Sequence, residues 1–150
     1  MILANRLKAA GVALLLAAPA AAQDATDPTT MSEVRAEIAE AVDSIAAYSA
    51  QERDAALTEA RAVLKRLDTE IERREQVLRE NWAEMSGTAR ATAEDRLRDL
   101  RQARNTLGER YGALESGVNS AWDELKIGFS GAWTAFSDAW RAADEDMPAD

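Results

Sequence analysis

Residues 114–141 read LESGVNSAWDELKIGFSGAWTAFSDAWR, and this stretch decides the fold class. Its large apolar side chains recur at spacings of three and four residues, which places them along one face of an α-helix. The stretch also repeats itself with an offset of 11 residues, so that Val118, Phe129 and Trp140 align. Because eleven residues make close to three turns of a straight helix, the aromatic stripe should run nearly parallel to the helix axis.

The aromatic stripe supplies the candidate functional residues: Trp122, Leu125, Phe129, Trp133, Phe136 and Trp140. The favoured interpretation is that these side chains form a core against a neighbouring helix. The alternative is a face that binds a partner protein or a membrane surface, since aromatic residues on one side of an amphipathic helix suit both. Residues 117–143 hold more acidic than basic side chains, so anionic lipid would repel this face.

The same spacing continues in both directions and predicts two long helices, at about residues 31–85 and 89–143. A capping box at Thr30–Glu33 is expected to start the first helix, and nothing before residue 85 is expected to break it. Ser86–Thr88 should separate the two helices, with Gly87 in the left-handed conformation and Thr88 as the cap of the second helix. The prediction is an all-α fold in which residues 31–143 form an antiparallel coiled-coil hairpin.

Pairing of the two stripes supports this hairpin. If the turn centres on Gly87, residues equally far from it should face each other, and the apolar positions satisfy this register: Val34 with Trp140, Ile38 with Phe136, Ala41 with Trp133, and Leu67 with Leu107. Gly117 and Gly128 destabilise a helix interior, so each is expected where a neighbouring group approaches closely. A two-helix rod leaves most of the surface of each helix exposed to solvent. Two hairpins are therefore expected to pair into a four-helix bundle, which would make the protein a homo-oligomer.

The first 22 residues have the pattern of a secretory signal peptide. Arg6 and Lys8 form a positive segment, an apolar run of about ten residues follows, and Ala20–Ala22 supplies the small residues that a signal peptidase needs. Cleavage is expected after Ala22, which predicts export to the periplasm. Residues 23–30 then form a flexible lead-in, and residues 144–150 form an acidic disordered tail.

Composition excludes most catalytic chemistry. The chain of 150 residues has no His and no Cys, which removes imidazole catalysis, thiol nucleophiles, disulfides and the usual zinc ligands. No catalytic residue, cofactor or metal is predicted, and a hydrolase that uses carboxylates alone is not favoured because exposed helices offer no concave pocket. Ion pairs at helical spacing, such as Glu70 with Arg74, are expected on exposed faces.

Charge is unevenly distributed. The chain has 27 acidic and 18 basic side chains, and loss of Arg6 and Lys8 with the signal peptide makes the net charge −11. An exported protein of this charge is not expected to bind nucleic acid. The excess of acidic over basic side chains lies in two acidic arms, residues 23–60 and 111–150, whereas residues 61–110 are slightly basic. An antiparallel hairpin places the acidic arms side by side, where like charges cost stability.

A local motif resembles a poorly characterised bacterial family of small coiled-coil proteins that are often labelled stress-response proteins. The motif runs small-Ala-Trp-acidic-acidic-Leu-Lys-x-Gly and is followed by a second Ala-Trp. The matching positions here are Ser120, Ala121, Trp122, Asp123, Glu124, Leu125, Lys126, Gly128, Ala132 and Trp133. The resemblance implies a coiled-coil fold and a role in stress, and it brings no catalytic residues.

Two functional hypotheses follow. The first is a non-enzymatic exported coiled-coil protein that acts by protein–protein binding or scaffolding, in the context of envelope stress, with an unidentified protein partner. The second is a membrane-surface or lipid binder that uses the aromatic stripe. Charge disfavours the second.

Overall fold

The computed structural model describes residues 28–147, with side chains from Met31 onward. Four α-helices follow one another, separated by short 3-10 turns: α1 (Pro28–Ala47), η1 (Ala50–Glu52), α2 (Arg53–Asn81), η2 (Trp82–Glu84), α3 (Gly87–Ser116), η3 (Asn119–Ala121) and α4 (Trp122–Asp146). The predicted signal peptide (1–22) and residues 23–27 of the predicted lead-in lie outside the described residues. The all-α class is confirmed.

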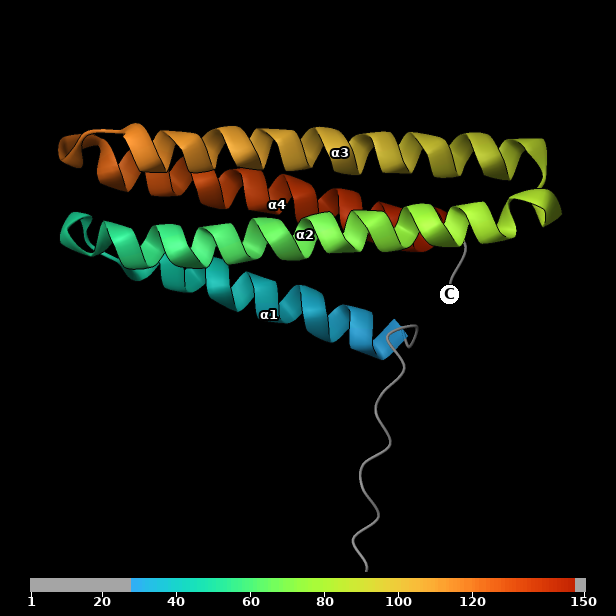
Figure 1. Ribbon diagram of the computed structural model, residues 1–150, viewed down its shortest axis with the longest axis horizontal. Coiled ribbons are helices and arrows are strands. Elements are labelled where there is room, and N and C mark those ends of the chain that lie inside the picture. The colour runs from blue at the N-terminus through green and yellow to red at the C-terminus, as the bar shows by residue number, and fades with distance from the viewer. Residues whose placement is uncertain (1–27, 148–150) are drawn as a thin grey trace, which may run out of the picture.

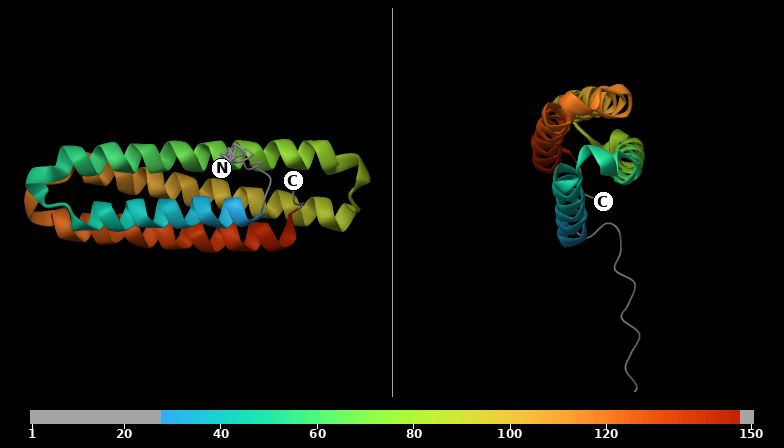
Figure 2. Two further views of the ribbon diagram at one scale, coloured as in Figure 1. Left: turned by 90° about the horizontal axis from the view of Figure 1, so that it is seen from below. Right: turned by 90° about the vertical axis from the view of Figure 1, so that its left-hand side faces the viewer.

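The helices form an antiparallel four-helix bundle. Helix α1 packs against α2 and α4, and α3 packs against the same two helices, so the four elements lie at the corners of a distorted square (Figures 1 and 2). Helix α1 tilts away from α2 toward its N-terminal end (Figure 1). The predicted two-helix hairpin is therefore wrong.

The bundle is the predicted hairpin folded once upon itself. The first predicted helix is broken at Tyr48–Glu52, and the second at Gly117–Ala121. Both breaks lie at the same end of the bundle, opposite the turn between α2 and α3 (Figure 1). As a result the α1–α4 pair covers the α2–α3 pair, and one chain completes the four-helix packing for which a second copy had been expected.

Within each pair the two helices run antiparallel, and their side chains meet near the predicted register but not in it. Between α2 and α3, Arg104 Nε donates to Asp68 Oδ1 at 2.7 Å. Between α1 and α4, Trp122 Nε1 donates to the Tyr48 carbonyl oxygen at 2.9 Å. Asp68 and Arg104 lie 19 and 17 residues from Gly87, and Tyr48 and Trp122 lie 39 and 35 residues from it. The same segments therefore face each other as in the predicted hairpin, displaced by two to four residues.

The first break is stabilised by a local cap. The Glu52 carboxylate accepts hydrogen bonds from the Ser49 backbone N–H at 3.2 Å and from Ser49 Oγ at 2.9 Å. Ser49 has extended backbone angles, with φ −78° and ψ 169°, so the chain leaves the helical path there. These carboxylate contacts replace the hydrogen bonds that an unbroken helix would make at this point.

The second break centres on Gly117, whose backbone is also extended (φ −72°, ψ 156°) and whose N–H donates to Ala113 O at 2.8 Å. A Cβ on Gly117 would lie 2.2 Å from Leu125 Cδ1, so the predicted close approach is confirmed here. It is not found at Gly128, where a Cβ would meet Arg110 Cδ at 3.6 Å, an ordinary contact.

The turn between α2 and α3 uses a different cap from the one predicted. Ser86 Oγ accepts a hydrogen bond from the Ala89 N–H at 3.1 Å, so Ser86 is the N-cap, and Thr88 lies inside the helix. Gly87 is the first residue of α3, and no residue from 28 to 147 has positive φ. A left-handed Gly87 was therefore a wrong prediction, since the extended Met85 backbone makes the turn instead. Thr30 likewise lies within α1 rather than before it.

Helix α4 continues three residues beyond the predicted end at residue 143. Acidic residues normally disfavour a helix C-terminus, yet Asp144 and Asp146 are helical here. Both carboxylates are paired with arginines of other helices, Arg74 and Arg96 respectively, and these ion pairs offset the unfavourable helix dipole. Residues 148–150 of the predicted tail lie outside the described residues.

Most of the predicted apolar stripes lie in the core, which also includes Val42, Ala56 and Val63 from outside them. Among its most buried side chains are Ile38, Ile45, Leu67, Leu100, Leu107, Leu114, Phe129, Phe136 and Trp140. Val118 was assigned to the same stripe but is 66% exposed. It lies in the second break, where the helical period is interrupted, so the eleven-residue repeat holds only within α4.

Candidate interaction surface

The aromatic stripe lies inside the bundle. Of the six candidate residues, five are buried and Leu125 is partly buried against them. Phe136 stacks on Trp133 with ring centroids 6.2 Å apart and meets Trp140 edge-on at the same distance. Such aromatic pairs add about 0.5–1.5 kcal/mol beyond the area that they bury. The structure thus places the stripe against the other helices rather than on an exposed face.

A buried ionic cluster lies beside the end of the stripe. Glu70 and Arg74 are each only 5% exposed, contrary to the prediction of an exposed pair, and Arg74 Nε donates to Glu70 Oε1 at 2.7 Å. The Arg74 guanidinium also binds Asp144 and lies 5.6 Å from the centroid of Trp140. Arg73 makes two further hydrogen bonds to Glu70. Two side chains of α4, Trp140 and Asp144, reach across the bundle to Arg74. A two-helix rod would leave this part of α2 exposed to solvent.

Ion pairs connect the acidic pair of helices to the more basic pair. Arg66 of α2 binds Glu37 of α1 at 2.9 Å, and Arg96 of α3 binds Asp146 of α4 at 2.6 Å. The two acidic arms do lie side by side, as the register predicts. Folding over brings both of them against the arginines of α2 and α3, which offsets the like-charge repulsion expected for an open hairpin.

A polar cluster holds the first break against α4. Lys126 Nζ donates to the carbonyl oxygens of Ala46 and Tyr48 at 2.8 and 2.7 Å. Two cations lie near the Trp122 ring: the Arg53 guanidinium carbon is 5.1 Å and Lys126 Nζ is 5.8 Å from its centroid. Arg53 Nε and Nη2 are buried without a hydrogen-bond partner, so the ring face is the main group that holds this guanidinium.

Two titratable groups at the same break have shifted pKa values. Tyr48 Oη donates to Glu59 Oε1 at 3.0 Å, and this hydrogen bond raises the pKa of the phenol above its ordinary value of 10.0. The hydrogen bonds from Ser49, first from its backbone and then from its hydroxyl, lower the pKa of Glu52 below its ordinary value of 4.5. Both shifts favour the protonation states found at neutral pH.

An open hollow lies on the outer side of the bundle between α1 and α4. It has a volume of about 480 Å³ and is lined by Ala46, Asp123, Lys126, Ile127, Ser130, Gly131 and Thr134. Ile127 is 72% exposed and points away from the core stripe. We call this feature the α1–α4 hollow. No periodic signal in the sequence marks this hollow, because Ile127 is a single large apolar side chain on the otherwise polar face of α4.

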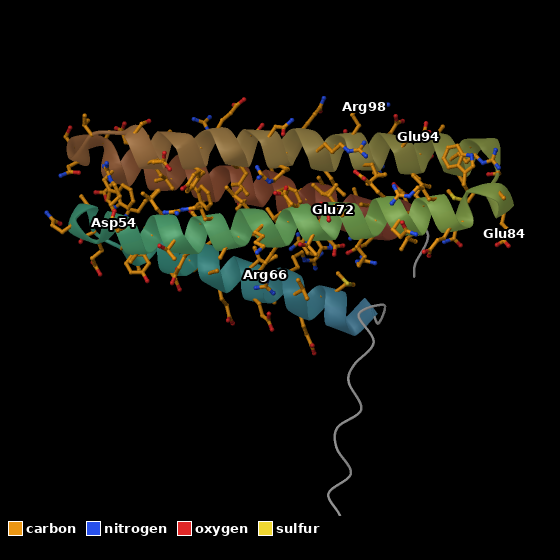
Figure 3. All side chains as sticks on the ribbon, in the orientation of Figure 1. Asp54, Arg66, Glu72, Glu84, Glu94 and Arg98 are labelled. Carbon is orange, nitrogen blue, oxygen red and sulfur yellow. The ribbon has the colours of Figure 1, made fainter. Side chains whose placement is uncertain are left out.

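A second hollow lies between α2 and α3, toward the turn that joins them. These two helices extend beyond the ends of α1 and α4 (Figure 2). The hollow has a volume of about 390 Å³ and is lined mainly by charged side chains: Glu75, Leu78, Arg79, Glu94, Leu97, Arg98 and Arg101. Charged side chains also cover the outer faces from Asp54 at one end of α2 to Glu84 near the turn (Figure 3). Acidic and basic groups alternate here, so this hollow has no single preferred charge of ligand.

Residues 28–147 contain no group of three or more side chains arranged to hold a metal ion. Within the same range, no helix combines the length and the apolar character needed to cross a membrane.

Comparison with known proteins yields no match: no family model, no curated protein and no solved structure is significantly similar to the chain. The resemblance carried by Ser120–Trp133 to stress-response coiled-coil proteins stays a prediction from that motif.

Proposed function

We propose that this chain is a non-enzymatic exported protein that acts by binding another protein through the outer surface of its helical bundle. The observation that carries the proposal is the contrast between the buried aromatic stripe and the exposed Ile127. The bundle completes its own core, and yet a large apolar side chain stays in water beside an open hollow. Exposed apolar groups mark sites of protein association when they lie next to one another, and here Ala46, Ile127 and Gly131 line the same hollow.

The partner in this proposal is a different protein rather than a second copy. A homo-oligomer was expected because a two-helix hairpin would leave apolar surface exposed to solvent, which a second copy could cover. Since four helices of one chain cover one another, that argument no longer applies. The acidic net charge of the chain also disfavours its self-association.

Export and a role in envelope stress belong to the same proposal. Export rests on the signal-like pattern of residues 1–22, and the role in stress rests on the motif at Ser120–Trp133. The alternative of a membrane-surface binder is less well supported, because Trp122, Phe129 and Trp140 are buried and would reach lipid only if the bundle opened.

Site-specific photo-crosslinking tests the proposal. A photoreactive phenylalanine derivative is placed at one exposed position on each side of the bundle, in cells that make the protein with its N-terminal segment: Glu40, Glu72, Arg98, Val118 and Ile127. A discrete adduct is expected from one side of the bundle and not from the others, and excess unlabelled mature protein should compete it away. If no position gives a competable adduct, the proposal of protein binding is wrong.

A further inference from the structure

The last turn of α4 is held in place by other helices rather than by its own residues. Asp144 and Asp146 bring negative charge to the C-terminal end of the helix, where the helix dipole is also negative. No basic residue of α4 lies in this turn to compensate them. Contacts across the bundle must therefore keep the turn helical.

Each of the other three helices contributes one arginine to this turn. Arg74 of α2 binds Asp144, and Nη1 of Arg35 in α1 lies 3.8 Å from Asp144 Oδ2. Arg96 of α3 binds Asp146 Oδ2 through Nη2 at 2.6 Å and through Nε at 2.7 Å. Two carboxylates thus connect the end of α4 to every other helix of the bundle.

The end of the hydrophobic core lies under these contacts. Trp140 and Ala143 are fully buried, and Met147, directly after the helix, is buried as well. The Arg74 guanidinium lies 5.6 Å from the centroid of the Trp140 ring, so the arginine that binds Asp144 also packs on this indole. Trp140 Nε1 is buried without a hydrogen-bond partner, and water would supply one if the turn opened. Release of the turn would therefore expose the end of the aromatic stripe.

Protons and salt ions can reach the carboxylates of this turn. The side chains of Asp144 and Asp146 are 41% and 35% exposed, and Glu145 between them adds a third negative charge. The charged groups of the other helices around them are Arg35 of α1, Glu70, Arg73 and Arg74 of α2, and Arg96 and Asp99 of α3. Acid removes the negative charge on which the contacts of the three arginines with Asp144 and Asp146 depend.

The opposite end of α4 is attached by contacts of a different kind. Lys126 Nζ and Trp122 Nε1 donate to backbone carbonyl oxygens at the end of α1, and these carbonyl groups do not take up protons where carboxylates do. The carboxylates of Glu52 and Glu59 accept hydrogen bonds from hydroxyl groups of the first break. Protonation of these two residues leaves the Lys126 and Trp122 contacts in place, so α4 should stay attached at its N-terminal end.

We propose that residues 144–147 form a charge-operated latch. The ionised carboxylates of Asp144 and Asp146 keep this end of the bundle closed, and acid releases the last turn of α4 and exposes Trp140 while the two breaks stay closed. The latch goes beyond the proposed function and does not depend on it, because release requires no partner.

Hydrogen–deuterium exchange at constant neutral pH tests the latch. The double variant Asp144→Asn/Asp146→Asn of the mature chain imitates protonation without a change in the intrinsic rate of exchange. Exchange of the segment 137–147 should become about tenfold faster, as expected for loss of two partly exposed ion pairs, whereas the segment 122–130 should exchange as in the wild type. Glu109→Gln/Asp138→Asn is the matched control, because it removes the same charge from exposed positions and should leave both segments unchanged.

A charge reversal tests whether the Arg96–Asp146 pair itself is responsible. Arg96→Glu should speed exchange of the segment 137–147, and addition of Asp146→Arg to the same chain should restore protection. A merely structural role of the Arg96 side chain would not be rescued in this way. Failure of the second substitution to restore protection would contradict the latch.

The wild-type chain provides a test without any substitution. At about 1 M salt the Debye length is only about 3 Å, so the segment 137–147 should exchange faster while the segment 122–130 does not. Near pH 4, with rates corrected for intrinsic exchange, the same difference between the two segments should appear. If acid and salt change neither segment, or speed both equally, the bundle has no latch at this end and the inference is wrong. Photo-crosslinking to a partner would then still test the proposed function separately.

Discussion

Lys126 Nζ lies 2.7 Å from the carbonyl oxygen of Tyr48, so a side chain of α4 caps the C-terminal end of α1, 78 residues earlier in the chain. Helix α1 has no basic residue in its own last turn. A cation at this end satisfies carbonyl groups that have no partner within the helix and interacts favourably with the helix dipole. The contact therefore stabilises the first break and attaches α4 to it at the same time.

Replacement of Lys126 by Met should destabilise the bundle. The change leaves the Ala46 and Tyr48 carbonyl groups without their cationic donor, and a lost hydrogen bond from a charged group costs about 1–3 kcal/mol. Urea unfolding followed by circular dichroism measures the free energy of unfolding. Arg141→Met, on the same helix but exposed, is the control and should change stability by less than about 0.5 kcal/mol. Equal losses in the two variants would contradict the capping role.

Arg74→Met should be among the most damaging single substitutions of a charged residue. It removes one of the two arginines that bind the buried Glu70 carboxylate, together with the contact to Asp144. Because Arg73 still donates two hydrogen bonds to Glu70, we expect a loss of about 1–3 kcal/mol rather than that of a fully unpaired buried charge. Thermal unfolding gives the shift in midpoint relative to Arg98→Met, which removes an exposed guanidinium from α3. A midpoint for Arg74→Met as high as that of the control would show that the buried cluster contributes little.

Two glycine substitutions should have different effects. Gly117→Ala places a methyl group 2.2 Å from Leu125 Cδ1 and 2.7 Å from the Ala113 carbonyl oxygen, so the second break must shift, at a cost of about 1–3 kcal/mol. Gly131→Ala meets no atom within 4 Å and should stabilise α4 by about 1 kcal/mol. Chemical denaturation of the two variants compares them directly, and destabilisation by Gly131→Ala would mean that its surroundings are tighter than described.

The Ser49–Glu52 cap predicts a pH dependence. Because the pKa of Glu52 is lowered in the folded state, its contribution to stability is complete above its ordinary value of 4.5 and is lost as pH falls through the lower folded-state pKa. Glu52→Gln should therefore destabilise the protein near neutral pH, and the difference from wild type should shrink below pH 4.5. Urea unfolding at a series of pH values measures this, with Glu84→Gln as an exposed control that should show no such trend.

Tryptophan fluorescence tests the burial of the aromatic stripe. Trp122, Trp133 and Trp140 are buried, so emission should be blue-shifted in the absence of any ligand. Trp82, near the turn between α2 and α3, is only partly buried, and Trp82→Phe should remove most of the emission that acrylamide quenches. Addition of lipid vesicles should change neither property. A large blue shift with vesicles would favour the membrane-binding alternative.

Sequence periodicity predicted which faces are buried but not where the helices break. Ile38 and Phe136 are both buried, as their stripes require, because spacing at three and four residues directly reflects burial on one helix face. The break at Ser49 has no Pro and no positive φ to mark it, so a continuous helix satisfied the same pattern. The signals that were present are the Ser49-x-x-Glu52 spacing and the long interval without a stripe residue between Tyr48 and Leu57.

The charge distribution was a second missed signal. The chain has two acidic arms on either side of a more basic segment. In the predicted hairpin, repulsion between these arms is expected to lower stability. The same pattern indicates that the arms fold over the centre, as the pairs Arg66–Glu37 and Arg96–Asp146 show. Ile127 lies off the apolar stripe, so helical period already predicts its exposure. Its place beside a hollow could not be predicted, because the hollow also includes Ala46 at the end of α1.

Arg35 near the start of α1 lies 3.8 Å from Asp144 near the end of α4, so the two ends of the described chain lie at the same end of the bundle (Figure 2). A circular permutant is therefore feasible, in which a short linker joins the ends and new termini are cut between Met85 and Gly87. Such a chain would run α3, α4, α1, α2 and keep every helix pair that is now in contact. If it folds, the order of the helices along the chain is dispensable, and the complementary faces of the helices are enough to specify the bundle.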